Sequence, residues 1–132
     1  MDDGLVTVIS RRSAHDTIDA LVEAATRAGL TIFARIDHAA NAAAAGMTLR
    51  PTELVMLGNP RNGTVLMQDE QSAGLDLPFR ALAWEDENGE VWLTYNDPHW
   101  IGRRHELGFR SKEVLMAIET GIAGISRAAT GT

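Results

Sequence analysis

Cysteine is missing from the 132-residue sequence, which excludes thiol nucleophiles, disulfides, iron–sulfur clusters and cysteine-ligated zinc. Long apolar runs are missing too, since no segment approaches the ~20 apolar residues that cross a membrane as a helix. The first residues, MDDGLVTV, have neither a basic start nor a long apolar run, and therefore predict no secretory signal. We expect a cytoplasmic protein that does not enter the membrane.

Basic residues are fewer than acidic residues, 12 against 18, and the formal net charge is −6. A protein that binds duplex nucleic acid needs a concentrated basic surface. The one basic segment, at 103–112, is short and is interrupted by Glu106, so a solvated surface explains it better. The sequence therefore predicts no nucleic-acid partner.

What the chain does contain is typical of a folded globular protein. Apolar residues make up 45% and charged residues 23% of the sequence, which argues against a disordered chain. The length suffices to bury a core without metal or disulfide support. We expect residues 1–132 to form a single domain.

Apolar periodicity and turn residues predict an α+β fold. Strands are expected at 5–10, 31–36, 53–57, 80–86 and 91–96, and helices at about 13–29, 65–72 and 111–128. Short helices are expected after Asp37 and Asp97, which are suited to cap them. The order β-α-β-(α)-β-α-β-β-α predicts a two-layer sandwich, in which helices cover one face of a mixed sheet of about five strands. The first two strands are expected to be parallel, because a helix connects them as a right-handed crossover.

Asn88-Gly89 is the residue pair preferred by a two-residue type I′ hairpin. If these residues form the whole loop, Leu82 faces Tyr95 and Trp84 faces Leu93, and this set turns toward the helices. The other face then carries Trp92 among small and polar side chains. On the strand at 31–36, alternation predicts that Ile32 and Ile36 point inward, with Phe33, Arg35 and Asp37 on the other face. Such a half-apolar surface must meet water, a ligand or another subunit, and we expect a homodimer.

Asp37-His38 lies where a strand gives way to an alanine-rich helix, a position at which scaffolds often hold ligands. The two side chains are candidates for an acid–base pair or for metal ligation. The simpler interpretation is that Asp37 caps the helix and His38 is an exposed first-turn residue, because adjacent helical residues point ~100° apart.

Glu53 is a third candidate for proton transfer. If its strand lies beside that of Glu85, the two carboxylates would be close enough for their proton affinities to become different, as acid–base catalysis requires. Alternatively, Glu53 pairs with Arg35 or Arg50 and Glu85 is solvated. The sequence alone leaves this choice open.

A zinc site would need His38, His99 and His105, together with a carboxylate, to converge at about 2 Å from one ion. The spacing of His99 and His105 matches no compact ligand motif, so no metal is predicted and these residues are weak candidates. No nucleophile elbow and no dinucleotide fingerprint occurs. The sequence identifies no cofactor.

The segment NPRNGT, at 59–64, resembles an anion cradle at the start of a helix. Free N–H groups there, together with Arg61, would favour phosphate or carboxylate, and Thr64 is expected to cap the helix that follows. Tight turns of this composition also occur for purely conformational reasons. The predicted ligand-binding residues are Asp37, His38, Asn59, Arg61, Gly63 and Thr64.

Several short motifs follow one another along the chain. They are FARIDH at 33–38, PTEL at 51–54, GNP at 58–60 with Gly63, LM at 66–67, LP at 77–78, WED at 84–86 and WLTYNDP at 92–98. In this order, from about Val6 to Ala128, the chain resembles the bacterial and archaeal family known as domain of unknown function 302. The resemblance implies a compact α+β domain that often pairs into dimers. It implies no activity, and it transfers no catalytic residues.

Three hypotheses about function follow. The leading one is a non-catalytic or regulatory module that forms a homodimer and binds a small anionic ligand near Asp37, His38, Asn59 and Arg61. The alternative is a small enzyme that uses Asp37, His38 or Glu53 for proton transfer, with or without a metal. The third is a purely structural dimer without a ligand.

Overall fold

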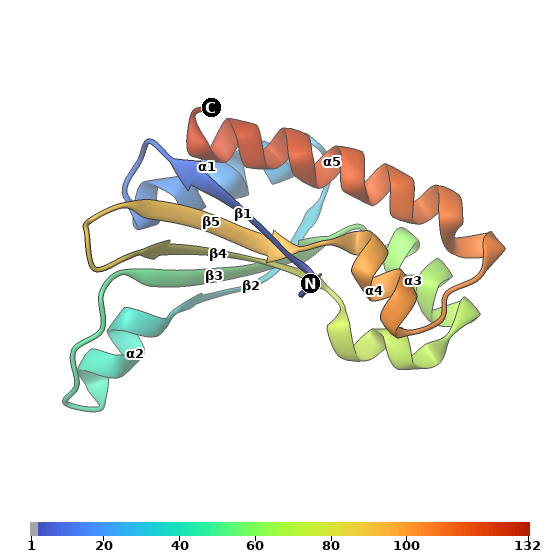
Figure 1. Ribbon diagram of the computed structural model, residues 1–132, viewed down its shortest axis with the longest axis horizontal. Coiled ribbons are helices and arrows are strands. Elements are labelled where there is room, and N and C mark those ends of the chain that lie inside the picture. Colours follow the sequence, from blue (N-terminus) through green and yellow to red (C-terminus); the bar gives the residue numbers. More distant parts are fainter. Residues whose placement is uncertain (1–2) are drawn as a thin grey trace.

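The computed structural model describes residues 3–132 (Figure 1). Five strands, five α-helices and two short 3₁₀ helices (η) make up the described chain. In chain order they are β1 (Leu5–Ser10), α1 (Ala14–Arg27), β2 (Thr31–Asp37), α2 (His38–Ala44), β3 (Thr52–Gly58), α3 (Pro60–Asp69), η1 (Gln71–Asp76), β4 (Phe79–Glu85), β5 (Val91–Asn96), α4 (Pro98–Arg104), η2 (Phe109–Ser111) and α5 (Lys112–Thr130). The predicted α+β fold with a five-stranded sheet is confirmed.

Local capping sets where the helices begin. The hydroxyl of Ser13 accepts a hydrogen bond at the start of α1, and the carboxylate of Asp37 accepts one from the N–H of Ala40 at 2.9 Å. Asp97 does the same for the N–H of His99 at 3.0 Å. Each cap satisfies a backbone donor that the helix itself leaves without a partner. These starts were predictable because a cap acts within three residues.

The sheet is antiparallel throughout, so the prediction of a mixed sheet was wrong. Its strand order is β1-β5-β4-β3-β2, and every neighbouring pair is antiparallel. Four antiparallel steps separate β1 from β2, so these two strands run in the same direction at opposite edges. The helix α1 therefore crosses the whole sheet instead of joining neighbours. The handedness rule constrains such a connection but does not say how many strands it passes.

Two helices cover one face of the sheet. In Figure 1, α1 and α5 lie along the same face, α2 lies at one end of the sheet, and α3, η1 and α4 gather at the other. Ile18 and Leu21 of α1 are fully buried against Val55 and Leu93 of the sheet. Burial of such a side chain contributes about 1.5–3 kcal/mol, so this layer supplies much of the driving force for folding. None of the helices between residues 3 and 132 is long and apolar enough to cross a membrane.

The hairpin between β4 and β5 has a loop one residue longer than expected. The N–H of Asp86 donates to the carbonyl of Glu90 at 2.8 Å, so residues 87–89 form the loop. Gly89 has a φ of 82°, as in a type I turn followed by a left-handed glycine bulge.

The Asp86 carboxylate favours this longer loop. It accepts hydrogen bonds from the N–H groups of Asn88 and Glu90 and from the indole N–H of Trp92. The Trp92 bond is the main reason that the pKa of Asp86 lies below its ordinary value, and burial opposes the shift.

A one-residue change in loop length turns one strand over relative to its partner. The predicted orientation of Leu82 and Trp84 toward the helices was therefore wrong, since they lie on the opposite face. The side chains of the hairpin that face α1 and α5 are Ala81, Ala83, Val91, Leu93 and Tyr95. Small residues on β4 leave room for the buried side chains of α1.

A β-bulge at Phe33 corrects a second prediction. The pairing of β2 with β3 shifts by one residue between Ile32 and Ala34, so Phe33 is the extra residue. Beyond the bulge, Arg35 lies opposite Val55 on the helix-covered face, and Ile36 lies on the other. The alternation predicted from Ile32 failed because a bulge reverses the alternation of every later side chain.

The face of the sheet away from α1 and α5 carries a band of large apolar side chains, called here the open face. Leu54 lies opposite Leu82, and the rings of Trp84 and Trp92 lie with their centroids 6.5 Å apart. At the β1 edge, Ile9 lies opposite Trp92 and remains 43% exposed.

Candidate functional site

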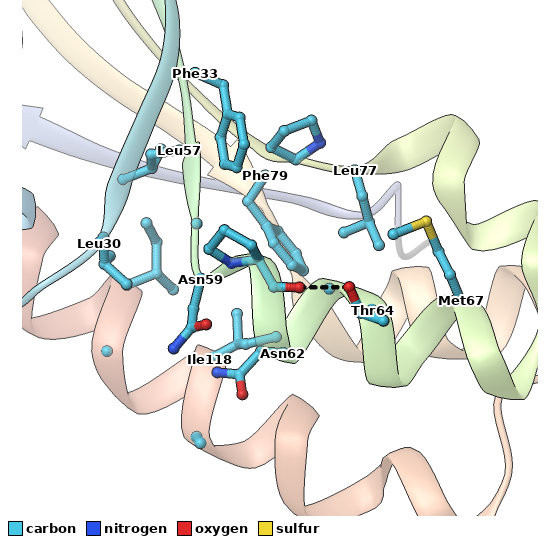
Figure 2. Close-up of a pocket in the computed structure, with 17 residues that line it drawn as sticks. Leu30, Phe33, Leu57, Asn59, Asn62, Thr64, Met67, Leu77, Phe79 and Ile118 are labelled. Atoms are coloured by element: carbon cyan, nitrogen blue, oxygen red, sulfur yellow. Dashed lines mark hydrogen bonds between the residues drawn. The ribbon is translucent and has the colours of Figure 1, made fainter.

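A pocket of about 290 Å³ opens between α3, α5 and the ends of β2, β3 and β4 (Figure 2). Most of its wall is apolar. It is lined by Leu30, Phe33, Leu57, Gly58, Asn59, Pro60, Asn62, Gly63, Thr64, Met67, Leu77, Pro78, Phe79, Ala117, Ile118, Gly121 and Ile122. No lysine, arginine or histidine is among these residues. Binding sites for small molecules are commonly apolar cavities with a few polar groups that orient the ligand.

The polar groups of the pocket come from the N-terminal end of α3, between its cap Asn59 and Thr64. Asn59 accepts a hydrogen bond from the N–H of Arg61 at 2.9 Å, and the hydroxyl of Thr64 donates to the carbonyl of Pro60 at 2.7 Å (Figure 2). Within residues 3–132 the side-chain amide of Asn62 makes no hydrogen bond, and Figure 2 shows it near Ile118. Asn62 is therefore free to bind a polar group of a ligand.

The structure corrects the expected position of the helix that follows β3. The segment at 59–64 does not precede a helix, because α3 already begins at Pro60 and is capped by Asn59. Thr64, expected as the cap, lies inside the helix. Proline at the first helical position needs no N–H donor, which explains why the helix starts there.

Of the six predicted ligand-binding residues, Asn59, Gly63 and Thr64 line the pocket. The other three do not. Arg61 is exposed on α3, while Asp37 and His38 are exposed at the junction of β2 and α2. The structure thus brings together half of the predicted set.

A second polar cluster lies between α1 and the β2–β3 edge. Glu53, only 6% exposed, holds its Oε1 2.5 Å from the Nε of Arg35 and its Oε2 3.2 Å from the Nδ1 of His15. Asp19 completes it, 2.7 Å from the guanidinium of Arg35 and 3.4 Å from His15. Of the alternatives open for Glu53, the structure shows the pairing with Arg35.

Burial opposes the charge on Arg35, but its hydrogen bonds to Glu53 and Asp19 outweigh that effect. The pKa of its guanidinium lies above the ordinary value. Asp37 occupies the position directly opposite Glu53 on the neighbouring strand, on the same face of the sheet. Two of the three predicted proton-transfer residues are thus cross-strand neighbours, while His38 lies outside this cluster on α2.

The other two histidines with predicted roles contact single carboxylates. His99 Nε2 lies 3.1 Å from Glu119, and His105 Nε2 lies 2.5 Å from Asp76. Among residues 3–132, no three side chains of histidine, aspartate or glutamate are placed so that they could hold a metal ion.

Sequence reasoning missed the apolar wall of the pocket. Leu77 and Phe79 look like ordinary core residues in the sequence, and Phe33 was expected on the half-apolar face of its strand without any link to these two residues. Gly121 offered the one local signal, because a glycine in the middle of a helix lowers its stability relative to alanine. A Cβ built at Gly121 meets no atom within 4 Å.

Comparisons with known proteins support the fold and the family. The family model described as Domain of unknown function DUF302 matches residues 6–125. A crystal structure of a DUF302 protein from Bacillus stearothermophilus superimposes with a TM-score of 0.84, covering 97% of this chain and 99% of that chain at 17% identity. At this identity the likeness shows the fold alone.

Two curated relatives come from Brucella. Fluoride-specific ion channel FluC 1 of Brucella suis biovar 1 and fluoride-specific ion channel FluC 2 of Brucella melitensis biotype 1 are each 52% identical to this chain over 131 residues. The match covers 99% of this chain but 52% and 48% of those proteins. The chain thus spans about half the length of the curated relatives it matches.

Proposed function

The chain belongs to the DUF302 family, and we propose that it is a homodimeric module that binds a small molecule in the pocket between α3 and α5. The pocket carries this proposal. Its volume of about 290 Å³ is at the lower end of the range for ligand sites, ~300–1,000 Å³, so the ligand is smaller than a typical drug.

The lining indicates the chemistry of the ligand. An apolar body fits among Phe33, Leu77 and Ile118, and a polar end fits beside the free amide of Asn62. Arg61, one residue earlier on α3, is near enough in sequence to attract an anionic end without lining the pocket. We therefore propose a short-chain amphiphile, with a carboxylate as the anionic form of its polar end.

Hexanoate and 1-hexanol form a matched pair of probes in a thermal-shift assay. A ligand present at a hundred times its Kd stabilises the folded state by about 2.7 kcal/mol, which corresponds to several degrees for a domain of this size. We expect both probes to raise the melting temperature, and Arg61→Gln to weaken only the response to hexanoate. If Arg61→Gln responds to hexanoate as strongly as the unaltered chain does, Arg61 does not attract the carboxylate, and the proposal of an anionic ligand is wrong.

Gly121 allows the pocket to be filled without disturbing its wall, because a side chain there meets open space. Gly121→Leu should abolish the response to both probes, and Gly121→Ala should reduce it. Gly124→Ala is the matched control on the same helix, since Gly124 does not line the pocket. Replacing glycine by alanine in a helix favours the helix by about 1 kcal/mol, and this gain is the same for Gly121→Ala and Gly124→Ala. The two variants should therefore differ only in their response to the ligand. If Gly121→Leu binds as well as the unaltered chain, the pocket is not the site.

The names of the Brucella relatives suggest fluoride as a further anion to test. We propose that this module regulates the remainder of such proteins and does not bind fluoride itself, because fluoride has no apolar part to fill the largely apolar pocket. Sodium fluoride should shift the melting temperature no more than sodium chloride at equal concentration. A shift specific to fluoride, retained in Gly121→Leu, would contradict this assignment.

We place the dimer interface on the open face. Five strands ~4.8 Å apart and about six residues long at ~3.4 Å each span roughly 500 Å² before side-chain relief is counted. That area, which includes polar residues such as Thr94 as well as the apolar band, is somewhat less than the ~800 Å² per partner of a standard interface. Two such faces, with Trp84 and Trp92 near the hairpin end of each, would pack against each other as the two sheets of a β-sandwich do.

Ile9→Arg places a charge on this face at a position that is already 43% exposed. It should dissociate the dimer in light scattering without lowering the stability of the monomer. Leu75→Arg is the control, because Leu75 is a 68% exposed leucine on η1, away from the open face. A chain that is monomeric before any substitution, at high micromolar concentration, would refute the dimer.

A further inference from the structure

His105 is the buried histidine with the most specific surroundings, and each of its ring nitrogens has a partner. Nε2 lies 2.5 Å from Asp76 Oδ2, and Nδ1 lies 2.9 Å from the hydroxyl of Ser72. The residue is 8% exposed, so most of its imidazole ring is shielded from water. None of the three residues lines the pocket between α3 and α5.

The protonation of the ring follows from the charge on Asp76. That carboxylate also accepts hydrogen bonds from Arg104 Nη1, at 3.1 and 3.2 Å, which balance its negative charge. An ionised carboxylate can only accept hydrogen bonds, so Nε2 of His105 carries a proton and donates it to Asp76. In the neutral ring, Nδ1 then has a free lone pair and accepts the hydroxyl proton of Ser72.

This order of groups is the arrangement that activates a serine. A base within hydrogen-bond reach of the hydroxyl, oriented in turn by a third group, is the signature of nucleophilic catalysis. Ser72 is an exposed residue of η1, so an incoming molecule can approach it from solvent, whereas its base His105 is buried. Asp76 is in the same 3₁₀ helix and Arg104 is at the end of α4, which holds the array between two rigid elements.

We propose that Ser72 is a nucleophile that accepts acyl groups from short-chain carboxylic esters, with His105 as its base and Asp76 as a positioning residue. The Ser72 oxygen bonds to the ester carbonyl carbon while its proton passes to His105 Nδ1. The bond to the alcohol oxygen then breaks, and the alcohol leaves with that proton. A water molecule, deprotonated by the same nitrogen, attacks the acyl-serine, and the carboxylic acid is released as the serine regains its proton. An ester and water thus yield an acid and an alcohol. A short acyl group is proposed because Ser72 lines neither the pocket between α3 and α5 nor the hollow between α4 and η2.

The experiment measures acetylation by p-nitrophenyl acetate in the full chain, as a burst of nitrophenol, together with labelling by a fluorophosphonate located by peptide mass spectrometry. We expect labelling at Ser72, with a rate that is sigmoidal in pH, as one titrating base requires. Ser72→Ala should lower the burst rate by at least about 100-fold, the usual contribution of a general base. Ser13→Ala is the matched control, because Ser13 is an exposed hydroxyl that only caps α1.

Asp76→Asn separates catalysis from structure. An amide can present its own N–H to His105 and so disturb the tautomer, and the burst rate should fall while labelled protein remains folded by circular dichroism. Because substitution of the buried His105 could unfold the chain, Ser72→Ala and Asp76→Asn carry the test. Equal labelling of Ser72 and Ser13, a rate that rises without limit with pH, or a full burst in Ser72→Ala would each overturn the proposal. In those cases the array serves only to tie η1 to α4.

Discussion

Replacing Arg35 by methionine tests how much the cluster around Glu53 contributes to stability. Methionine keeps much of the apolar stem of arginine but leaves the Glu53 carboxylate, 6% exposed, with His15 as its remaining partner. Breaking a fully buried ion pair costs ~3–5 kcal/mol. The Arg35 side chain is 31% exposed, so water can replace part of the lost interaction, and we expect a cost of about 2 kcal/mol.

The expected shift in melting temperature follows from the size of the chain. An unfolding entropy of ~2.1 cal/mol/K per residue amounts to roughly 0.28 kcal/mol/K over the 132 residues. A loss of about 2 kcal/mol then lowers the melting temperature by ~7 °C. Thermal melts followed by circular dichroism and urea titrations would both measure it.

A control pair of similar geometry but different burial is available on α1. Arg27 lies 2.6 Å from Glu23, with side chains 79% and 64% exposed. Arg27→Gln should therefore cost less than about 0.5 kcal/mol. The double variant Arg35→Met/Glu53→Gln should recover part of the loss, because no unpaired charge then remains buried. If Arg35→Met costs no more than Arg27→Gln, burial does not determine the strength of these pairs and the reasoning fails.

Three smaller predictions concern the hairpin and α2. Gly89→Ala should destabilise the protein by about 1–2 kcal/mol in urea titrations, because Gly89 has a φ of 82° and a Cβ disfavours the left-handed conformation. The lowered pKa of Asp86 means that its stabilisation is present above the ordinary carboxyl value of 3.8 and is lost as pH falls through the lower folded value. The difference in melting temperature between the unaltered chain and Asp86→Asn should therefore shrink on acidification, and a difference that grows would contradict the assignment. His38→Ala should change stability by less than about 0.5 kcal/mol, because His38 is exposed and surface substitutions rarely do more; a larger loss in a thermal melt would show that it packs.

The residues of the candidate site were only partly predictable from the sequence, because some of them carry a local signal and others do not. Asn59, Gly63 and Thr64 were identified because caps and glycines are local signals, and they do line the pocket. Phe33 and Ile118 were not, since an apolar side chain that lines a pocket and one that fills a core look the same in sequence. Glu53 was recognised as a charge in a strand, but the choice between Arg35 and Arg50 as its partner depended on which face of β2 carries Arg35.

Short-range patterns in the sequence were enough to predict the identity and the approximate extent of most elements. The strand Leu5–Ser10 and the helix start at Ser13 agree with the structure, because periodicity and capping involve residues within one or two turns of each other. The error at α3 arose where two local signals, Asn59 before proline and Thr64 after glycine, competed as caps.

The tertiary structure alone decided the strand order, the faces of the strands and the grouping of distant side chains. One residue in a hairpin loop and one bulge at Phe33 reversed the faces of β4 and of the second half of β2. Side chains alternate between the two faces of a strand. A shift of one residue in the strand pairing therefore changes the local free energy little, but it exchanges the side chains that point toward the core with those that point away from it. Ser72, Asp76 and His105 meet only because η1 packs beside the end of α4. The strand register and the packing of the helices depend on the free energy of the whole core. Residues from distant parts of the chain contribute to it, so no short stretch of sequence predicts them.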